Sequence, residues 1–210
     1  VEAMAHHYPK ALKESGTDMG RVRHAFAMAV PKTGPKVVHG DLDIRLENSI
    51  TKVDKKIWNN LMGAHGAMDW DGLLFLENSF QGNDLKEHNW EFRYLIIMDL
   101  KGKPILATFM TIGLWKDDML AKESISKTLE QTRKYDPYHL TARALSLGSL
   151  FTEGNHLYLD RRHPLKDRAL NILMWILETL GHKMGAKMTV LRDFPNAGFM
   201  FGRSFSLWRY

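Results

Sequence analysis

The hydrophobic pattern after residue 48 starts with helical periodicity. Ile57, Trp58, Leu61 and Met62 share one helical face, and Asp54 is placed to cap the N-terminus of that helix. A second stripe with the same period is formed by Leu73, Leu74, Leu76 and Phe80. The pattern therefore predicts two consecutive amphipathic helices, the first ended by Gly63 and Gly66.

The period then changes to that of strands. Residues 92–100 and 105–115 are rich in aromatic and β-branched side chains, and the turn Lys101-Gly102-Lys103-Pro104 separates them. This pattern predicts an antiparallel hairpin. The polar stretch 116–134 that follows contains helix formers of mixed charge, which favours an exposed helix or a flap over this part of the molecule.

The last block predicts a crossover. Residues 143–150 are expected to form a strand, 151–155 a turn, 156–160 a short strand and 161–164 a loop. A long amphipathic helix over 165–184 then ends at Gly185, and a strand follows at 187–193. The order strand, loop, helix, strand is typical of a βαβ unit with a parallel strand pair. The predicted fold is therefore α/β (α+β), with a mixed, mostly antiparallel sheet and flanking helices.

The first 48 residues differ from this pattern. Turn chemistry at Pro31-Lys32-Thr33-Gly34-Pro35 stops any helix that precedes it. We therefore expect residues 1–48 to be an N-terminal arm or partial unit and residues 49–210 to be the main domain. Because the chain begins with Val1, one further expectation is that it is part of a larger, fused biosynthetic protein.

Composition narrows the function classes. The chain has no cysteine, which excludes disulfides, thiolate zinc sites and cysteine nucleophiles. With no secretory signal and no apolar run of about 18 residues, we expect a cytoplasmic protein without membrane spans. The histidines lack metal-ligand spacing, so no metal is expected. The net charge of +5 leaves room for a local anion site, but the basic residues form no aromatic-interleaved stripe, so nucleic-acid binding is not expected.

The order of the elements, together with the stretch Leu147-Gly148-Ser149-Leu150-Phe151-Thr152-Glu153-Gly154, resembles the GNAT superfamily of acyltransferases and its Fem-type relatives over roughly residues 50 to 195. The resemblance implies an N-acyltransferase that moves an acyl group from a thioester, acyl-CoA or a carrier, to an amine by direct attack. The implied partners are coenzyme A thioester as cosubstrate and a small amine or amino-acid-like acceptor, with homodimer formation left open.

The chain departs from the GNAT pattern where the resemblance implies a phosphate-binding loop. GNAT enzymes usually carry Arg/Gln-x-x-Gly-x-Gly/Ala there, whose N–H groups hold the coenzyme A pyrophosphate at a helix N-terminus. Residues 160–168 have no glycine, and Pro164 has no N–H. Instead the loop is basic, and positive side chains oppose the helix dipole unless an anion is bound. The phosphate-binding candidates are Arg161, Arg162 and Lys166, within a cluster that includes His163 and Arg168.

Acyl transfer to an amine needs a base for the amine proton and donors for the developing oxyanion. Glu153 in the predicted turn is the first candidate base. His156 and Tyr158, on the same face of the short strand, are the next. The main chain at Gly148, Ser149 and Leu150 is the candidate site for the thioester arm and carbonyl. The alternatives are an ordinary turn carboxylate and packed aromatic side chains.

A second function stays open beside the acyltransferase. The missing glycines also fit a non-catalytic GNAT-like module that binds a ligand or a partner. Turnover with acyl-CoA and amines distinguishes the two hypotheses.

Overall fold

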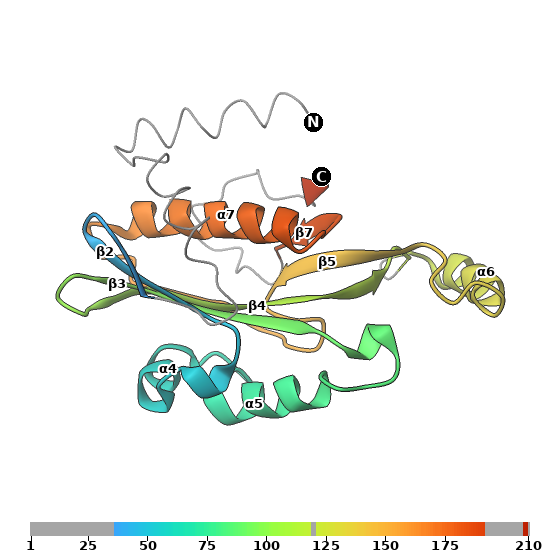
Figure 1. Cartoon of the computed structure of the whole chain (residues 1–210), viewed down its shortest axis with the longest axis horizontal. Coiled ribbons are helices and arrows are strands. Elements are labelled where there is room, and N and C mark those ends of the chain that lie inside the picture. The colour runs from blue at the N-terminus through green and yellow to red at the C-terminus, as the bar shows by residue number, and fades with distance from the viewer. Residues whose placement is uncertain (1–35, 119–120, 192–207, 210) are drawn as a thin grey trace.

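A computed structural model describes residues 36–118, 121–191 and 208–209. In this part of the chain the strands form a single sheet in the order β1-β2-β3-β4-β5-β7-β8, and β6 pairs with β4 (Figure 1). Among the described strands, only β5 and β7 pair in parallel, with their register centred on Leu145↔Thr189. The strands are β1 (Lys36–His39), β2 (Leu42–Glu47), β3 (Glu91–Asp99), β4 (Pro104–Lys116), β5 (Thr141–Leu147), β6 (Leu157–Leu159), β7 (Met188–Val190) and β8 (Trp208–Arg209). The predicted mixed, mostly antiparallel sheet is confirmed.

Helices cover both faces of the sheet. Figure 1 shows α7 (Lys166–Lys183) on one face, and α4 (Lys55–Met62) and α5 (Trp70–Ser79) on the other. The short 3-10 turns η1 (Ile50–Lys52) and η2 (Lys86–His88) precede α4 and β3, respectively. Within the described residues, no helix combines the length and apolar character needed to cross a membrane.

Strand alternation explains why the molecule has two cores. Leu95 and Ile97 of β3 belong to the core beneath α7, whereas Tyr94 and Ile96 belong to the core beneath α4 and α5. All four are buried. Because successive side chains of a strand point to opposite faces, one apolar strand serves both cores. Full burial of each such side chain stabilises the fold by about 1.5–3 kcal/mol.

The predicted hairpin is the antiparallel pair of β3 and β4. The carboxylate of Asp99 accepts the N–H groups of Lys101 and Lys103 at 2.9 and 2.8 Å, and Gly102 takes a φ of +80° in the turn. The hydrogen bond from the Lys103 main chain is the main reason why the pKa of Asp99 lies below its usual value. The turn is thus fixed by one acidic side chain.

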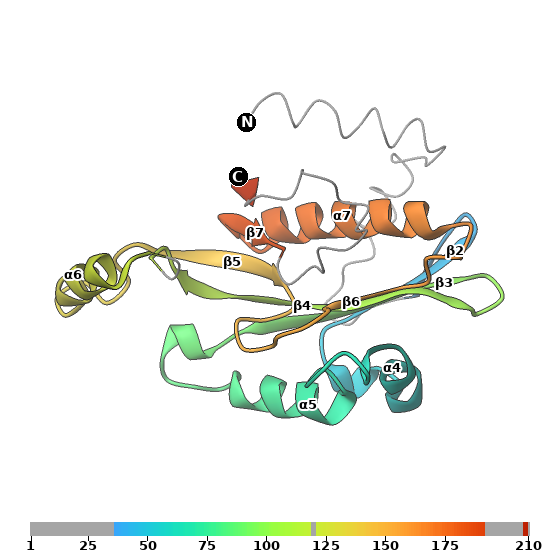
Figure 2. The ribbon, with the colours of Figure 1, turned by 180° about the vertical axis from the view of Figure 1, so that it is seen from behind.

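The predicted strands at 143–150 and 156–160 are two halves of one interrupted strand. The pair Thr111↔Ser146 aligns β5 with β4, and Thr108↔Leu157 aligns β6 with the same strand. Residues 148–156, here called the β5–β6 loop, therefore leave the sheet opposite a short gap on β4. Figures 1 and 2 show the loop on the side of the sheet covered by α5.

The expected crossover after residue 156 is confirmed with one correction. The chain passes from β6 through α7 to β7, but β7 pairs in parallel with β5 rather than with β6. This follows from the interrupted strand, because β5 and β6 run in the same direction along β4 and only β5 lies beside β7.

Residue 48, the expected domain boundary, directly follows β2, which belongs to the same sheet as β3. β2 pairs with β3 from Leu42↔Asp99 to Glu47↔Tyr94, and β1 pairs with β2. The polar-apolar alternation of β2 places Leu42, Ile44 and Leu46 in the core beneath α7. The rest of the expected arm, residues 1–35, lies outside the described residues, as do residues 192 and 193 of the last predicted strand.

β4 and β5 extend past the other strands as a two-stranded arm that ends in α6 (Glu123–Arg133), which confirms the exposed helix expected within 116–134 (Figure 1). The arm is held by Arg133, whose guanidinium donates to Asp118 at 2.6 Å and to the carbonyl of His139 at 2.9 Å. The side chains of Arg133 and Asp118 are 4% and 6% exposed, so this ion pair is screened from water.

This ion pair should make the stability of the protein depend on pH. The hydrogen bond from Arg133 lowers the pKa of Asp118 from 3.8 to about 2, against an opposing effect of burial. A carboxyl whose pKa is lowered on folding stabilises the fold above its unfolded pKa and loses that contribution as the pH falls through its folded pKa. The wild-type protein should therefore melt above Asp118→Asn at about pH 5, and this advantage should shrink toward pH 2. A constant difference in Tm across that range would contradict the prediction.

Candidate functional site

A chain of hydrogen bonds inside the β5–β6 loop joins three buried polar side chains. The hydroxyl oxygen of Ser149 accepts the N–H groups of Phe151 and Thr152 at 3.2 and 3.1 Å. It therefore donates its proton to Thr152 Oγ1, 3.0 Å away. Thr152 in turn donates to Nε2 of His156 at 2.8 Å. This direction of donation places the proton of the neutral imidazole on Nδ1.

The loop's ends are fixed to β4. Gly148 donates its N–H to the carbonyl of Phe109 at 2.9 Å, and the hydroxyl of Thr108 donates to the carbonyl of His156 at 2.7 Å. Ser149 donates its N–H to Thr152 Oγ1 at 3.1 Å. The main-chain donors expected at Gly148 and Ser149 are therefore already used inside the protein. His156 likewise uses Nε2 to hold the loop, and its ring packs edge-on against Phe109.

Glu153 and Leu150 lie on opposite sides of the same loop. Leu150 is partly buried against the core beneath α4 and α5, whereas Glu153 is exposed. The connection between α4 and α5 packs on the loop next to Glu153, where Nδ1 of His65 lies 2.9 Å from the carbonyl of Asn155. Of the candidate bases, Glu153 is the one whose side chain is exposed to solvent.

Tyr158 lies in β6 opposite Ala107 and is half-buried on the side of α4 and α5. His156 faces the same side, through its contact with Phe109, as the alternation of the strand predicts. The Tyr158 hydroxyl lies near the ion pair between Lys103 and Asp160, whose Nζ and Oδ2 are 2.7 Å apart. That ion pair, rather than Tyr158, is the main cause of the raised pKa of Lys103.

One edge of β6 is left open by the described strands, because β6 pairs only with β4 among them. Along an antiparallel pair, residues whose main chain bonds to the partner strand alternate with residues whose main chain points away from it. The N–H of Asp160 donates to the carbonyl of Ile105 at 2.8 Å. The main-chain groups of Leu157 and Leu159 therefore point toward the open edge. The side chain of Asn155 accepts the N–H of Leu157 at 3.1 Å, as that orientation requires. The edge can accept an extended ligand as an added strand.

The cationic loop follows at the other end of β6, and much of its charge is balanced locally. Asp160 accepts the main-chain N–H of Arg162 at 3.0 Å, and Lys166 pairs with Asp167 at 3.0 Å. Arg161 and Arg162 are exposed. Within the described part of the chain, the guanidinium of Arg162 takes part in no ion pair. Arg162 is therefore the cation best placed to accept an outside anion.

His163 caps the helix start where the sequence predicts an anion. It is 6% exposed, and its Nδ1 accepts the N–H of Leu165 at 3.2 Å. The proton of the ring therefore lies on Nε2, which donates to Asp99 at 3.3 Å. One orphan donor at the start of α7 is thus satisfied by a side chain of the protein itself.

The predicted site residues form two groups, one at each end of β6. Gly148, Ser149, Leu150, Glu153 and His156 lie in the β5–β6 loop. Arg161, Arg162 and Lys166 lie at the start of α7, and Tyr158 lies between the two groups. Figure 2 shows β6 running from the loop toward α7. The arrangement suits a long ligand with an anionic end.

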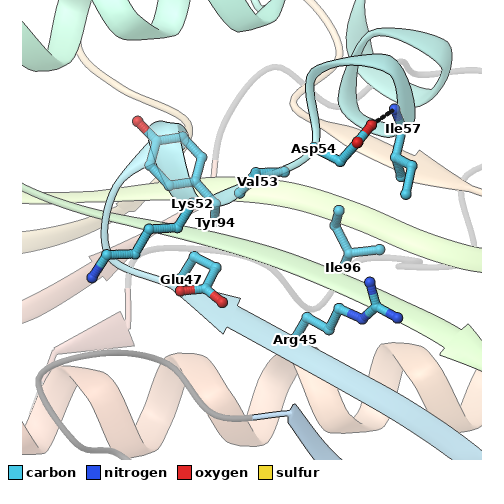
Figure 3. Close-up of a pocket in the computed structure, with 8 residues that line it drawn as sticks. All are labelled: Arg45, Glu47, Lys52, Val53, Asp54, Ile57, Tyr94 and Ile96. Carbon is cyan, nitrogen blue, oxygen red and sulfur yellow. Dashed lines mark hydrogen bonds between the residues drawn. The ribbon is translucent and has the colours of Figure 1, made fainter.

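A separate pocket of about 50 Å³ lies between β2, β3 and the start of α4 (Figure 3). Its floor is apolar, with Tyr94 and Ile96, and its rim carries both charges, from Arg45, Glu47, Lys52 and Asp54. This pocket was not predicted from the sequence, because residues 1–48, which include β2, were expected to form an N-terminal arm or partial unit. The alternation Asp43, Arg45, Glu47 between apolar residues was the signal of a polar strand face.

In the described ranges, no cluster of three or more His, Asp or Glu side chains is arranged to hold a metal ion. Comparison of the chain with protein-family models, curated proteins and solved structures found no match.

Proposed function

We propose that the protein is an N-acyltransferase of the GNAT type, with an acyl thioester bound along the open edge of β6. The supporting observation is the outward-facing main chain of Leu159 and the outward-facing carbonyl of Leu157, which lie between a fixed loop and the exposed Arg162; the N–H of Leu157 is used by Asn155. The amides of a pantetheine arm would pair with this edge as an added strand, and the phosphates would meet Arg161, Arg162 and Lys166.

The order of elements also supports the GNAT proposal. From β2 to β7 the chain forms one strand, two helices, an antiparallel hairpin, the exposed helix α6, an interrupted strand, a long helix and a strand parallel to β5. The thioester would lie beyond the end of β7, where β6 pairs with β4 on one edge and its other edge is open.

The proposed reaction joins the amine nitrogen of the acceptor to the thioester carbonyl carbon and breaks the carbon–sulfur bond. Glu153, or a water that it holds, takes the amine proton, and the departing thiolate is protonated to the free thiol. Tyr158 is the second candidate for the proton transfer. His156 acts by holding the loop, because its Nε2 accepts from Thr152.

Replacing Arg162 by alanine should weaken binding of acetyl-CoA by about 1–3 kcal/mol, because one charge-assisted hydrogen bond to a phosphate is lost. Isothermal titration calorimetry measures the change. Arg168→Ala is the matched control, since it removes the same charge near the helix start, but its guanidinium pairs with Asp41 at 3.2 Å. Equal affinities of wild type and Arg162→Ala would remove the loop from the site.

Turnover tests the proposal as a whole. We expect thiol release from acetyl-CoA in the presence of a panel of primary amines, and its loss in Glu153→Gln with acetyl-CoA affinity retained. One observation favours the second function, a non-catalytic binding module, because the N–H groups of Gly148 and Ser149 are not available to an oxyanion. Thermal stabilisation by acyl-CoA without any thiol release would support that module.

A further inference from the structure

Two segments meet at the end of the molecule where α7 begins. They are the turn between β3 and β4 (residues 99–103) and the loop between β6 and α7 (residues 160–165). Figures 1 and 2 both show the turn between β3 and β4 at the same end of the sheet as the start of α7. Two contacts between acidic and basic side chains join the two segments. They therefore form one surface, here called the basic end.

The acids of the basic end are more buried than its cations. Asp99 accepts from Nε2 of His163 at 3.3 Å, and Oδ2 of Asp160 lies 2.7 Å from Nζ of Lys103. The side chains of Asp99 and Asp160 are 17% and 16% exposed, whereas that of Lys103 is 58% exposed. Both acids also accept main-chain N–H groups within their own segments. The carboxylates therefore hold the two segments together, and the surface that water reaches is mainly cationic.

Further cations and one apolar side chain are exposed on the same segments. Lys101, Arg161 and Arg162 are exposed, and among the described residues neither Lys101 nor Arg162 takes part in an ion pair. Leu100, beside Lys101 in the turn, is 61% exposed. This combination suits a protein partner of opposite charge, which covers about 800 Å² of each surface. A partner of that size contacts both segments at once, so its binding does not require their side chains to converge on one point.

The start of α7 offers few main-chain donors to the pyrophosphate of a free nucleotide. The N–H of Leu165 donates to Nδ1 of His163 at 3.2 Å. The N–H of Lys166 donates to the carbonyl of the same histidine at 3.2 Å, and Pro164 has no N–H. Helix N-termini bind phosphates through such N–H groups when these are free. The positive charge is instead carried by side chains spread over two segments, which matches one phosphate joined to a wide acidic surface.

We infer that the acyl donor reaches the protein on the phosphopantetheine arm of a carrier protein with an acidic surface, which docks on the basic end. The inference rests on the proposed function, because the arm would run along the open edge of β6 and its phosphate would meet Arg162. After the acyl group has passed to the amine, the carrier leaves with a free thiol on its arm. The docking step itself needs no acyl group.

The test of docking uses the full chain and an acyl carrier protein of fatty acid synthesis in its holo form, an acidic protein whose arm ends in a free thiol. We expect saturable binding by calorimetry that weakens at least tenfold when the salt concentration is raised from about 0.05 M to about 0.5 M, because salt screens exposed charges. Lys101→Glu should weaken binding at least tenfold and Leu100→Ser several-fold, each with an unchanged Tm. Lys127→Glu is the matched control, since it reverses an exposed charge on α6, at the opposite end of the sheet, and should have no effect (Figure 1).

Acyl transfer distinguishes docking from damage to the reaction site. The acetylated carrier should have a kcat/KM at least tenfold above that of acetyl-CoA, and Lys101→Glu should remove this advantage. The same substitution should leave kcat/KM unchanged for acetyl-phosphopantetheine, which carries the arm without a protein. An equal loss with both donors would place Lys101 at the reaction site rather than on the carrier, and would overturn the inference.

Binding alone can also overturn the inference. Absent carrier binding would do so. Polyglutamate that binds as tightly as the carrier would indicate attraction by charge alone, and a short single-stranded RNA that binds more tightly would indicate a nucleic-acid surface; either result is incompatible with a carrier site.

The outcomes distinguish the inference from the proposed function. Transfer from acetyl-CoA without carrier binding removes only the inference. Carrier binding without acyl transfer from any of the donors removes the acyltransferase and leaves a carrier-binding module.

Discussion

Replacing Gly148 by alanine is expected to destabilise the protein by about 3 kcal/mol, the sum of backbone strain and a steric overlap. Gly148 has a φ of +82°, a conformation that L residues rarely adopt. An added Cβ would also lie 2.6 Å from both Cγ and Nε2 of His156. The ring is bonded to Thr152, and the main-chain carbonyl of His156 is bonded to Thr108, so the residue has little freedom to move away.

Urea unfolding of the wild type and the variant measures this cost. Gly102→Ala provides the control, because Gly102 has nearly the same φ of +80° but no atom within 4 Å of an added Cβ. It should cost only the backbone strain, about 1 kcal/mol. If both substitutions cost the same, the packing of His156 against Gly148 contributes nothing and our account of the loop fails.

Replacing Arg133 by methionine is expected to destabilise the arm that carries α6 without unfolding the rest of the sheet. The stem of the side chain is kept, but Asp118 stays buried without its partner, and the carbonyl of Leu140 loses its donor at 3.2 Å. Leaving one member of a buried ion pair uncompensated is strongly destabilising. We expect the amides of α6 to exchange with solvent at least 100-fold faster, while those of β3 exchange at their usual rate.

Hydrogen exchange measured by mass spectrometry distinguishes the amides of α6 from those of β3. Lys127→Met is the comparison, since Lys127 pairs with Glu123 at 2.7 Å on the surface of the same helix, with side chains 74% and 81% exposed. Exposed pairs of this kind contribute little. Similar exchange in both variants would show that Arg133 does not anchor the arm.

The elements of the fold were largely predictable, because their period is a local property. The helical spacing behind Asp54 and the strand character of 92–100 and 105–115 each correspond to an observed element. Which strands pair with one another, in contrast, depends on residues that are far apart in the sequence. Nothing in residues 143–160 shows that β5 and β6 share one neighbour, since that depends on pairing with Thr108 and Thr111 far earlier in the chain.

The candidate site was predictable in residue type but not in its bonding. The basic residues after Asp160 are visible in the sequence, whereas the acidic side chains that contact two of them come from distant turns. Asp99 meets His163, and Asp41 meets Arg168. Likewise, the spacing of Ser149, Thr152 and His156 did not indicate that hydrogen bonds join these three side chains. The contact between the Phe151 and Trp90 rings was likewise not visible in the sequence.

The interrupted strand has a consequence for how this molecule can diversify. Both ends of the β5–β6 loop are attached to β4, at Phe109 and Thr108, so the segment between them can be exchanged without shifting either half of the strand. A loop of different length or composition could be grafted there as a cassette. The scaffold would keep its alignment while the chemistry displayed at its surface changed.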